Sequence, residues 1–264
     1  DKVNISAVAA IIIALLIVLM TQKSEAASIV SLFQPSAILI VLGGTFCASL
    51  LNFSPRTLSN AIKSAKEVFF TPKQAPIRVI DEIIYLARYA KKNGLFSLNE
   101  LVENIQDPFL RRGIQLSTDY NNPQMIYDIL NAELSYNEEE ELINSRVFEA
   151  FGGYAPTFGI VGAVMGLIQI MSYIQEPDVL AHGIATAFVS TLYGVGFANF
   201  LFLPIAGKLK MNLREKMLLK EVILQGIVSI QMGETPIVIE EKLLAYLNYH
   251  NKSHPLEESY GGIR

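Results

Sequence analysis

Hydrophobic residues along the chain gather in four long runs that contain no Asp, Glu, Lys or Arg. These runs cover residues 5–20, 29–53, 150–174 and 179–207. An α-helix needs roughly 20 apolar residues to cross a bilayer, and each run comes close to this length or exceeds it. The pattern predicts an all-α integral membrane protein in which four transmembrane helices form two hairpins.

The first run also has features of a secretory signal peptide. Lys2 precedes it, and the small residues Ala26 and Ala27 follow it, as at a signal cleavage site. The apolar core of a signal peptide is about 7–15 residues long, which is shorter than the run over 5–20. A transmembrane helix is therefore favoured over a signal peptide.

Two polar segments follow the second and fourth runs and set the expected orientation. Residues 54–149 contain 11 Lys or Arg and 14 Asp or Glu, and residues 208–264 contain 8 and 7. Lys23 is the only Lys or Arg in the short loops inside the two hairpins. Because Lys and Arg near transmembrane helices stay preferentially in the cytoplasm, both polar segments and both termini are predicted to be cytoplasmic. The expected parts are a hairpin over 5–53, a helical cytoplasmic domain over 54–149, a hairpin over 150–207 and a cytoplasmic C-terminal part over 208–264.

The polar segment before the second hairpin has the periodicity of helices. Residues 77–91 place apolar side chains on one face, and Gly94 is typical of a helix end. Ser97 and Glu100 have the spacing of a capping box, which predicts a helix over 98–105. We therefore expect a small helical domain.

Further helices are expected on both sides of the second hairpin. Pro108 and Pro123 each mark the start of a short helix. The four glutamates over 138–141 suit the N-terminus of a helix that leads into the third run. After the fourth run, residues 209–228 continue as a helix, and a last helix is expected over 237–248.

The composition excludes several other classes of protein. Hydrophobic residues make up 51% of the 264 residues, charged residues 17%, and the formal net charge is −4, so no nucleic-acid partner is expected. A single cysteine, Cys47, and three scattered histidines predict neither a disulfide nor a metal site. The sequence lacks the motifs of phosphate-binding loops, serine hydrolases and zinc hydrolases. Neither an enzymatic activity nor a cofactor is expected.

Small and polar residues stand out within the second hairpin. Small side chains let two membrane helices approach closely. Hydroxyl groups in lipid either bond to a carbonyl of their own helix or line a hydrated path, and both interpretations remain open. The glycines expected to pack helices are Gly159, Gly162, Gly166 and Gly194, and the hydroxyls that could line a path belong to Ser190 and Thr191.

Two prolines and one absence complete the pattern of the membrane runs. Pro156 and Pro204 each remove a backbone donor and can bend a helix near a membrane boundary. The four runs contain no carboxylate, although a proton or cation relay in a membrane normally uses one. If ions cross the membrane here, a partner protein must supply the carboxylate.

Several segments have a distinctive sequence: residues 146–167 (RVFEAFGGYAPTFGIVGAVMGL), 187–199 (AFVSTLYGVGFAN) and 204–209 (PIAGKL) in the membrane part, and 91–100 (KKNGLFSLNE) and 226–236 (GIVSIQMGETP) outside it. They resemble the MotA/PomA family, the A subunit of the bacterial flagellar stator. The resemblance covers nearly the whole chain. The wider superfamily includes TolQ and ExbB, which share the third and fourth membrane helices but usually lack the first pair and the large polar segment.

The resemblance implies a stator in which about five A subunits surround two B subunits. Each MotB-like B subunit is expected to contribute one membrane helix with an ion-binding aspartate, which explains the missing carboxylate. Ion flow past that aspartate would rotate the ring of A subunits and drive the rotor protein FliG. By the same resemblance, Pro156 and Pro204 couple ion flow to rotation, and Thr191 faces the ion site.

The resemblance also implies where the rotor is contacted. Lys91 matches the basic contact position of the family, with Arg88 and Lys92 close by. The acidic contact position falls on Asn99, which carries no charge, and Glu100 is the nearest acid. The basic half of the contact is thus retained, and we take Glu100 as the candidate for the acidic half.

The identity of the transported ion depends on one position in the third run. In sodium-driven relatives the residue after the second glycine of the motif is usually threonine, whereas here it is Ala163. A methyl group offers no lone pair, so Thr191 and Ser190 remain as the hydroxyl ligands, fewer than a dehydrated sodium ion needs. Proton transport is therefore expected rather than sodium transport.

Two other functions stay open from the sequence. A TolQ- or ExbB-like energiser of another envelope process would share the second hairpin. A passive membrane scaffold is a different class, and it predicts that exchanging Thr191 or Pro156 leaves every ion-linked function intact. In each case the expected location is the bacterial inner membrane, in contact with lipid.

Overall fold

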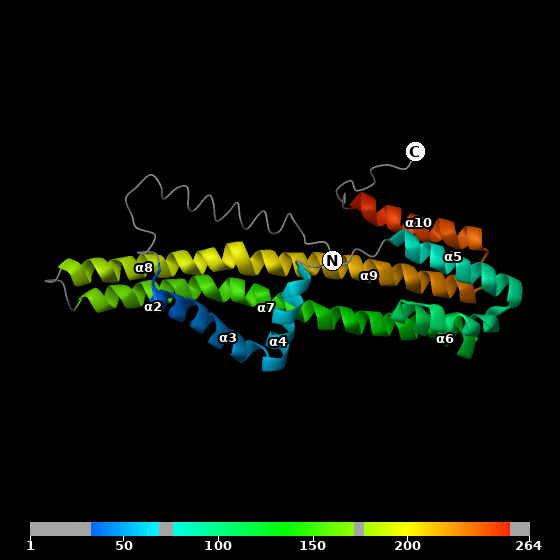
Figure 1. Cartoon of the computed structure of the whole chain (residues 1–264), viewed down its shortest axis with the longest axis horizontal. Coiled ribbons are helices and arrows are strands. Elements are labelled where there is room, and N and C mark those ends of the chain that lie inside the picture. The colour runs from blue at the N-terminus through cyan, green and yellow to red at the C-terminus, as the bar shows by residue number, and fades with distance from the viewer. Residues whose placement is uncertain (1–32, 69–75, 172–176, 254–264) are drawn as a thin grey trace. The chain divides into compact units, whose positions relative to one another are not determined.

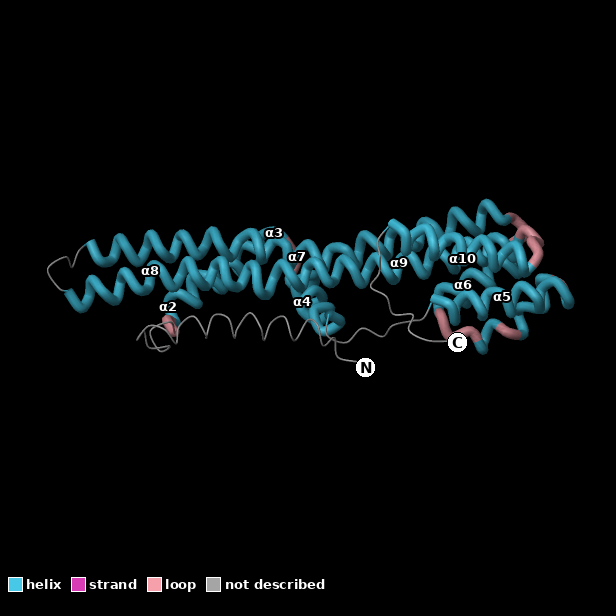
Figure 2. The backbone as a smooth tube through the Cα atoms, turned by 90° about the horizontal axis from the view of Figure 1, so that it is seen from above, coloured by secondary structure: helices cyan, strands magenta, loops and turns pink. Residues whose placement is uncertain are grey.

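The computed structural model of the chain describes residues 33–68, 76–171 and 177–253, and every regular element within these ranges is a helix. The all-α class predicted from the sequence is therefore confirmed for the described part (Figures 1 and 2). The chain divides into two compact units. The first comprises the described residues of Asp1–Pro72 and Glu139–Leu213, and the second those of Lys73–Glu138 and Arg214–Arg264.

Within the second apolar run, over 29–53, the first unit contains one continuous helix, called span two below. It consists of α2 (Pro35–Ile38), a π-helical turn η2 (Leu39–Gly43) and α3 (Gly44–Asn52). The residues just before Pro35 are not helical, so the described helix begins later than the start of the apolar run over 29–53. Pro35 suits this start because the first turn of a helix needs no backbone donor at that position.

A short amphipathic helix, α4 (Pro55–Ser64), follows span two, and the 3₁₀ turn η3 (Ala65–Val68) continues it. Ser54 caps α4 by accepting a hydrogen bond from the backbone N–H of Thr57 at 3.2 Å. In Figure 1, α4 runs across the direction of α7 and α8 rather than along it. The sequence analysis did not single out this helix.

The second hairpin consists of much longer helices than its apolar runs. Helix α7 (Pro123–Met171) has 49 residues, and α8 (Pro177–Phe197), the π-helical turn η6 (Ala198–Phe202) and α9 (Leu203–Gln231) follow one another directly. Helices α7 and α8 run side by side in both views (Figures 1 and 2). Among the residues that the structure describes, three helices are long and apolar enough to span a membrane, within Pro35–Asn52, Pro123–Met171 and Gly183–Gln231. The run over 5–20, predicted as the first span, lies outside the described residues.

Two predictions about α7 are wrong. Pro123 begins a 49-residue helix rather than a short one, and the glutamates over 138–141 lie in its interior rather than at an N-terminus. Glutamate is a good helix former, and Glu139 accepts a hydrogen bond at 2.8 Å from Arg146, two turns later. Glutamates can therefore continue the helix as readily as they begin one.

The second unit contains α5 (Pro76–Asn93), the 3₁₀ turns η4 (Leu95–Glu100) and η5 (Val102–Asn104), α6 (Pro108–Asp119) and α10 (Pro236–Ser253). The predicted helices over 77–91 and 237–248 and the helix after Pro108 are confirmed. The α-helix predicted over 98–105 is wrong, because 3₁₀ turns occupy this stretch.

The capping box predicted at Ser97 does not form. The Ser97 hydroxyl donates to the backbone carbonyl of Gly94 at 2.6 Å instead of accepting from an N–H group. Gly94 itself has a φ of 90°, a left-handed conformation that glycine adopts without strain. The chain therefore turns sharply after α5, and no α-helix starts at this point.

Close helix packing forms the core of the second unit. A Cβ atom added at Gly226 of α9 would lie 2.7 Å from Cγ2 of Ile83 in α5. One added at Gly113 of α6 would lie 2.1 Å from Cδ1 of Ile227 in α9. Because Ile83 and Ile227 are fully buried, these glycines make the room in which α5, α6 and α9 pack.

The first prediction concerns the start of α6. The Asp107 carboxylate accepts hydrogen bonds from the backbone N–H groups of Phe109 and Leu110, each at 2.9 Å. Asp107→Ala should lower the free energy of unfolding by about 1 kcal/mol and speed hydrogen exchange at these two amides, because an N-cap is lost. Hydrogen–deuterium exchange on the full chain in micelles measures this. Asp119→Ala removes an exposed acid at the other end of α6 and should leave the exchange unchanged. Equal exchange in both variants would contradict the capping role.

Candidate functional site

The backbones of α7 and α8 approach each other closely at two glycines. A Cβ atom added at Gly194 would lie 2.6 Å from the carbonyl oxygen of Ala155, and one added at Gly159 would lie 3.0 Å from that of Ser190. The Gly194 atom would also lie 3.1 Å from Cα of Pro156. Since the neighbouring atoms belong to the backbone, no side chain can move aside to make room. The structure therefore requires glycine at 194 and leaves very little room for a side chain at 159.

The same contact extends along the two helices. A Cβ atom at Gly166 would lie 3.1 Å from the carbonyl oxygen of Gly183. One at Gly162 would lie 2.8 Å from the hydroxyl oxygen of Ser190. The four glycines singled out in the sequence thus lie at one helix contact. Small residues are the usual means by which membrane helices pack in lipid.

The hydroxyl groups along α8 bond to carbonyls of their own helix. Ser190 donates to the carbonyl of Thr186 at 2.8 Å, and Thr191 donates to that of Ala187 at 3.3 Å. Of the two interpretations left open by the sequence, the structure of the single chain shows bonding within the helix. Each hydroxyl oxygen keeps lone pairs with which to accept a further hydrogen bond.

The three residues expected along an ion path differ in exposure. Ser190 is fully buried against Gly162, whereas Thr191 and Ala163 are half-buried. Ser190 therefore fills the contact between α7 and α8 and presents no free surface within the chain. Thr191 and Ala163 keep part of their surface free for a neighbouring molecule.

The two prolines occupy different structural positions. Pro156 lies within α7, where it is half-buried and faces Gly194 of α8. Pro204 is exposed and follows the π-helical turn η6 by two residues, in the first turn of α9. The missing N–H of Pro204 thus coincides with a change of helix type, whereas α7 continues as an α-helix through Pro156.

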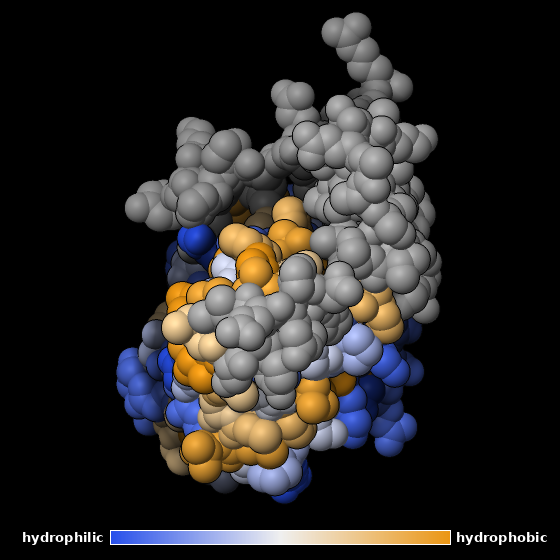
Figure 3. All heavy atoms as spheres, turned by 90° about the vertical axis from the view of Figure 1, so that its left-hand side faces the viewer, coloured by the Kyte–Doolittle hydropathy of each residue, from blue (hydrophilic) through white to orange (hydrophobic). Residues whose placement is uncertain are grey.

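Large hydrophobic side chains on the outside of α7 and α8 are exposed. Figure 3, which faces the end of this helix pair, shows hydrophobic side chains gathered around it. Such a surface is stable in lipid or against other protein chains, but not in water. The largest exposed side chains on the two helices include Ile160, Val164, Met165, Ile168, Phe188 and Leu192.

A small apolar cavity lies beside this helix pair in the first unit. Its volume is about 230 Å³, and it is lined by Leu42, Thr45, Phe46, Phe151 and Phe202. The Thr45 hydroxyl donates to the carbonyl of Val41, so no polar group in the lining is directed at a ligand. Among the described residues, no group of His, Cys, Asp and Glu that could hold a metal ion occurs.

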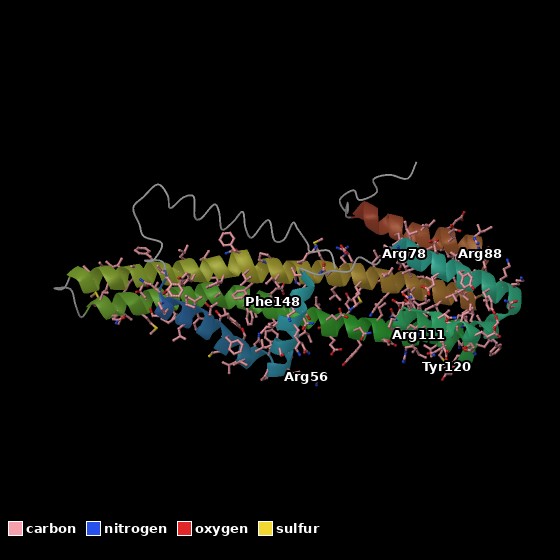
Figure 4. All side chains as sticks on the ribbon, in the orientation of Figure 1. Arg56, Arg78, Arg88, Arg111, Tyr120 and Phe148 are labelled. Carbon is pink, nitrogen blue, oxygen red and sulfur yellow. The ribbon has the colours of Figure 1, made fainter. Side chains whose placement is uncertain are left out.

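The charged residues expected to contact a rotor gather at one end of α5. Arg88, Lys91 and Lys92 are all exposed, and the two lysines lie in the last turn of the helix. Figure 4 labels Arg88 on α5, with Arg78 toward the other end of this helix. Positive charge at a helix C-terminus is favourable because it complements the helix dipole. The structure places Glu100 in η4, the turn that packs against α5.

Tyr89, which the sequence analysis missed, links α5 to the acidic residue of η4. Its hydroxyl donates to the Glu100 carboxylate at 3.0 Å. This hydrogen bond raises the pKa of the Tyr89 phenol above its ordinary value, and desolvation and the charge of Glu100 add to the shift. Tyr85 and Tyr89 are one helical turn apart in the sequence, and this spacing indicates an aromatic face on α5. In the structure their ring centroids lie 6.5 Å apart.

Asn99, at the family's acidic position, has a different role in the structure. Its side-chain oxygen accepts a hydrogen bond at 2.8 Å from the hydroxyl of Thr118, a buried residue of α6. Through this hydrogen bond, Asn99 connects η4, the turn after α5, to α6. Glu100 is the acid that remains on the exposed side of the same turn.

A family model and several relatives match the chain. The model for the MotA/TolQ/ExbB proton channel family matches residues 101–221. Motility protein A of Bacillus subtilis is 35% identical over 221 residues, which cover 82% of this chain and 81% of that protein. Chemotaxis protein PomA of Vibrio alginolyticus is 31% identical over 223 residues, covering 84% of this chain and 87% of that protein.

Two solved structures resemble the whole fold. The structure of the flagellar MotAB stator complex from Bacillus subtilis contains a chain that matches with a TM-score of 0.83 and 31% identity, over 97% of this chain and 100% of that one. The structure of C. jejuni MotAB contains one that matches with a TM-score of 0.87 and 25% identity, over 99% of each chain.

The second prediction tests the close contact of α7 and α8. Gly194→Ala should destabilise the folded chain by roughly 1–3 kcal/mol, because the new Cβ atom would overlap the Ala155 carbonyl. Thermal unfolding of the purified chain in detergent measures the loss. Gly196→Ala, two residues later on the same helix, is the matched control, because nothing lies within 4 Å of its added atom. If both variants unfolded at the same temperature, the contact would not limit stability.

Proposed function

The chain belongs to the MotA/PomA family within the MotA/TolQ/ExbB proton channel superfamily, and from this membership we infer that it is the ion-conducting, torque-generating A subunit of a flagellar stator. The observation that carries this function is the 35% identity to a motility protein over four-fifths of the chain. The apolar helices place the protein in the bacterial inner membrane. Its function is transport and movement rather than enzymatic catalysis.

We propose that a MotB-like B subunit supplies the ion-binding aspartate. The apolar runs over 29–53, 150–174 and 179–207 contain no carboxylate, and the two matching structures are both MotAB complexes. The exposed hydrophobic faces of α7 and α8 support further packing against protein chains. An assembly of five A subunits around two B subunits, with both termini of the A subunit in the cytoplasm, is part of the same proposal.

The rotor contact is proposed at the C-terminal end of α5. Arg88, Lys91 and Lys92 supply exposed positive charge there, and Glu100 supplies the adjacent negative charge. Exposed charges of both signs guide the approach of a charged partner and contribute little to stability. The proposed partner is the rotor protein FliG, with complementary charges.

Proton coupling is proposed on the chemistry around Thr191. Its hydroxyl oxygen and the methyl group of Ala163 are the half-buried groups of the expected path, while Ser190 is packed away. This chain therefore offers a dehydrated sodium ion few oxygen ligands, whereas a proton needs only a carboxylate and a chain of water molecules. Pro156 and Pro204 are proposed to couple ion flow to movement of the helices.

The alternative of a TolQ- or ExbB-like energiser is less well supported. The family model covers those proteins as well, but the relatives described above are named for motility and chemotaxis. The match to MotAB chains also covers the polar segment before the second hairpin.

The third prediction tests the rotor contact. Lys91→Glu combined with Lys92→Glu should lower the torque of tethered cells severely while membrane assembly stays intact, because both side chains are exposed. Charge reversal on the rotor should restore part of the torque. Arg78→Glu, an equally exposed charge near the other end of α5, should leave torque nearly unchanged. Wild-type torque in the double variant would remove these lysines from the mechanism.

The fourth prediction tests the ion. Rotation should continue when external sodium is replaced by potassium at a constant proton-motive force, because Ala163 provides no ligand for sodium. Rotation speed of single motors measures this. A motor that stopped without sodium and recovered when sodium returned would overturn the assignment. Ala163→Thr adds a hydroxyl at this place and should move the motor toward sodium dependence where the partner permits it.

A further inference from the structure

Helix α4 presents two chemically different faces. Leu58 and Ala61 are buried and pack in a cluster with Val147, Phe148 and Phe151 of α7. The opposite side carries exposed basic residues, and an exposed isoleucine lies at its flank. These outward-facing residues are Arg56, Ile62, Lys63 and Lys66. Because the apolar face is already occupied by protein, α4 has no need to insert into lipid, and its basic face remains free.

The position of α4 places this basic face next to lipid. Only Phe53 and Ser54 separate it from the end of span two, where Leu51 is 93% exposed. A leucine so exposed is stable where acyl chains surround it. The basic face therefore begins within one short turn of the lipid-exposed surface.

The direction of α4 agrees with this placement. It runs across α7 and α8, as a helix lying along a membrane surface does (Figure 1). Figure 4 shows Arg56 at the beginning of α4, at the end of this helix away from α9.

The charges of α4 have a single sign. Pro55–Ser64 contains Arg56 and Lys63 and no acid, and Lys66 and Glu67 follow it in η3. None of the acidic side chains that the structure describes pairs with Arg56, Lys63 or Lys66, whereas other exposed basic residues do have partners, such as Arg112 with Glu133 at 2.7 Å. Arg56 and Lys63 are seven residues apart, which puts them on the same side of the helix.

We propose that the outer face of α4 binds the headgroups of anionic phospholipids in the cytoplasmic leaflet. Arg56 and Lys63 supply the charge, and the exposed Ile62, at the flank of the same helix, supplies an apolar contact to the upper part of the acyl chains. This binding fixes the depth in the membrane of the end of span two and of the buried cluster that includes Val147, Phe148 and Phe151. The inference rests on the proposed orientation of the stator subunit.

The test compares lipid binding by the full chain, purified with the partner that copurifies, using native mass spectrometry. The probes are palmitoyl-oleoyl phosphatidylglycerol, which is anionic, and palmitoyl-oleoyl phosphatidylcholine, which is neutral overall. The wild-type chain should prefer phosphatidylglycerol. Arg56→Gln combined with Lys63→Gln should reduce this preference roughly fivefold for each charge, because a basic residue near an anionic surface contributes about that much. Binding of phosphatidylcholine should not change.

The matched control removes the same charge elsewhere. Arg78→Gln combined with Arg112→Gln affects two exposed arginines of the second unit and should keep the wild-type preference. Circular dichroism should show equal helix content in both double variants. An unchanged preference in Arg56→Gln with Lys63→Gln, or an equal loss in the control, would overturn the proposal.

A further arm separates a lipid from a free phosphate. Soluble glycerol phosphate at the concentration of the lipid should not displace phosphatidylglycerol, because the proposed site needs acyl chains beside it. Displacement at equal concentration would contradict the proposal. Lipid binding is measured without rotation, so its failure leaves the stator function standing, and failure to drive a motor leaves the lipid result standing.

Discussion

The backbone contact between α7 and α8 is the constraint on which the rest of the membrane part depends. Apolar side chains gain little by leaving lipid for another apolar surface, so close packing must supply the attraction between membrane helices. At Gly194 the backbones are so close that even a methyl group would overlap the Ala155 carbonyl oxygen, and at Gly159 a methyl group would lie only 3.0 Å from the Ser190 carbonyl oxygen. This contact fixes the rotation of α8 about its own axis. It thereby buries Ser190 and leaves Thr191 at the edge of the contact.

The distribution of charge separates what this chain does alone from what it needs others to do. The described spans pack through glycine, alanine and hydroxyl groups that are satisfied within each helix, so the helix pair can fold without any buried ion. The charged groups proposed to meet a rotor are exposed on α5 and η4, where a change of sign costs little stability. In the proposed stator, an ion path through such a chain depends on a carboxylate from the B subunit.

The sequence predicts those features that depend on local periodicity and fails where tertiary contacts decide. The helices over 77–91 and 237–248 are confirmed, the first because its amphipathic spacing acts locally, and the left-handed Gly233 lies between α9 and α10. The helix start predicted at the glutamates over 138–141 is wrong, since glutamate suits both the start and the interior of a helix. The capping box predicted at Ser97 is wrong because the Ser97 hydroxyl donates to the Gly94 carbonyl instead.

The candidate site shows the same limit. Residue type identified the glycines and hydroxyls of the second hairpin, but not which hydroxyl would be buried. Ser190 and Thr191 are neighbours in sequence, and only the position of Gly162 across the contact distinguishes them. The partnership of Tyr89 with Glu100 joins two elements and left no periodic signal in the sequence.

The geometry of Thr191 explains how a hydroxyl can serve both protonation states of a partner carboxylate in the proposed stator. Its bond to the Ala187 carbonyl is 3.3 Å long, whereas the Ser190 bond is 2.8 Å, so the Thr191 proton is held more weakly. While the Thr191 hydroxyl donates to the Ala187 carbonyl, its oxygen accepts a hydrogen bond from a protonated acid or a water molecule. When the acid loses its proton, rotation of the hydroxyl lets Thr191 donate to the carboxylate, and the Ala187 carbonyl retains its helical N–H bond. An alanine at this place offers neither role, and a buried hydroxyl such as that of Ser190 cannot reach the partner.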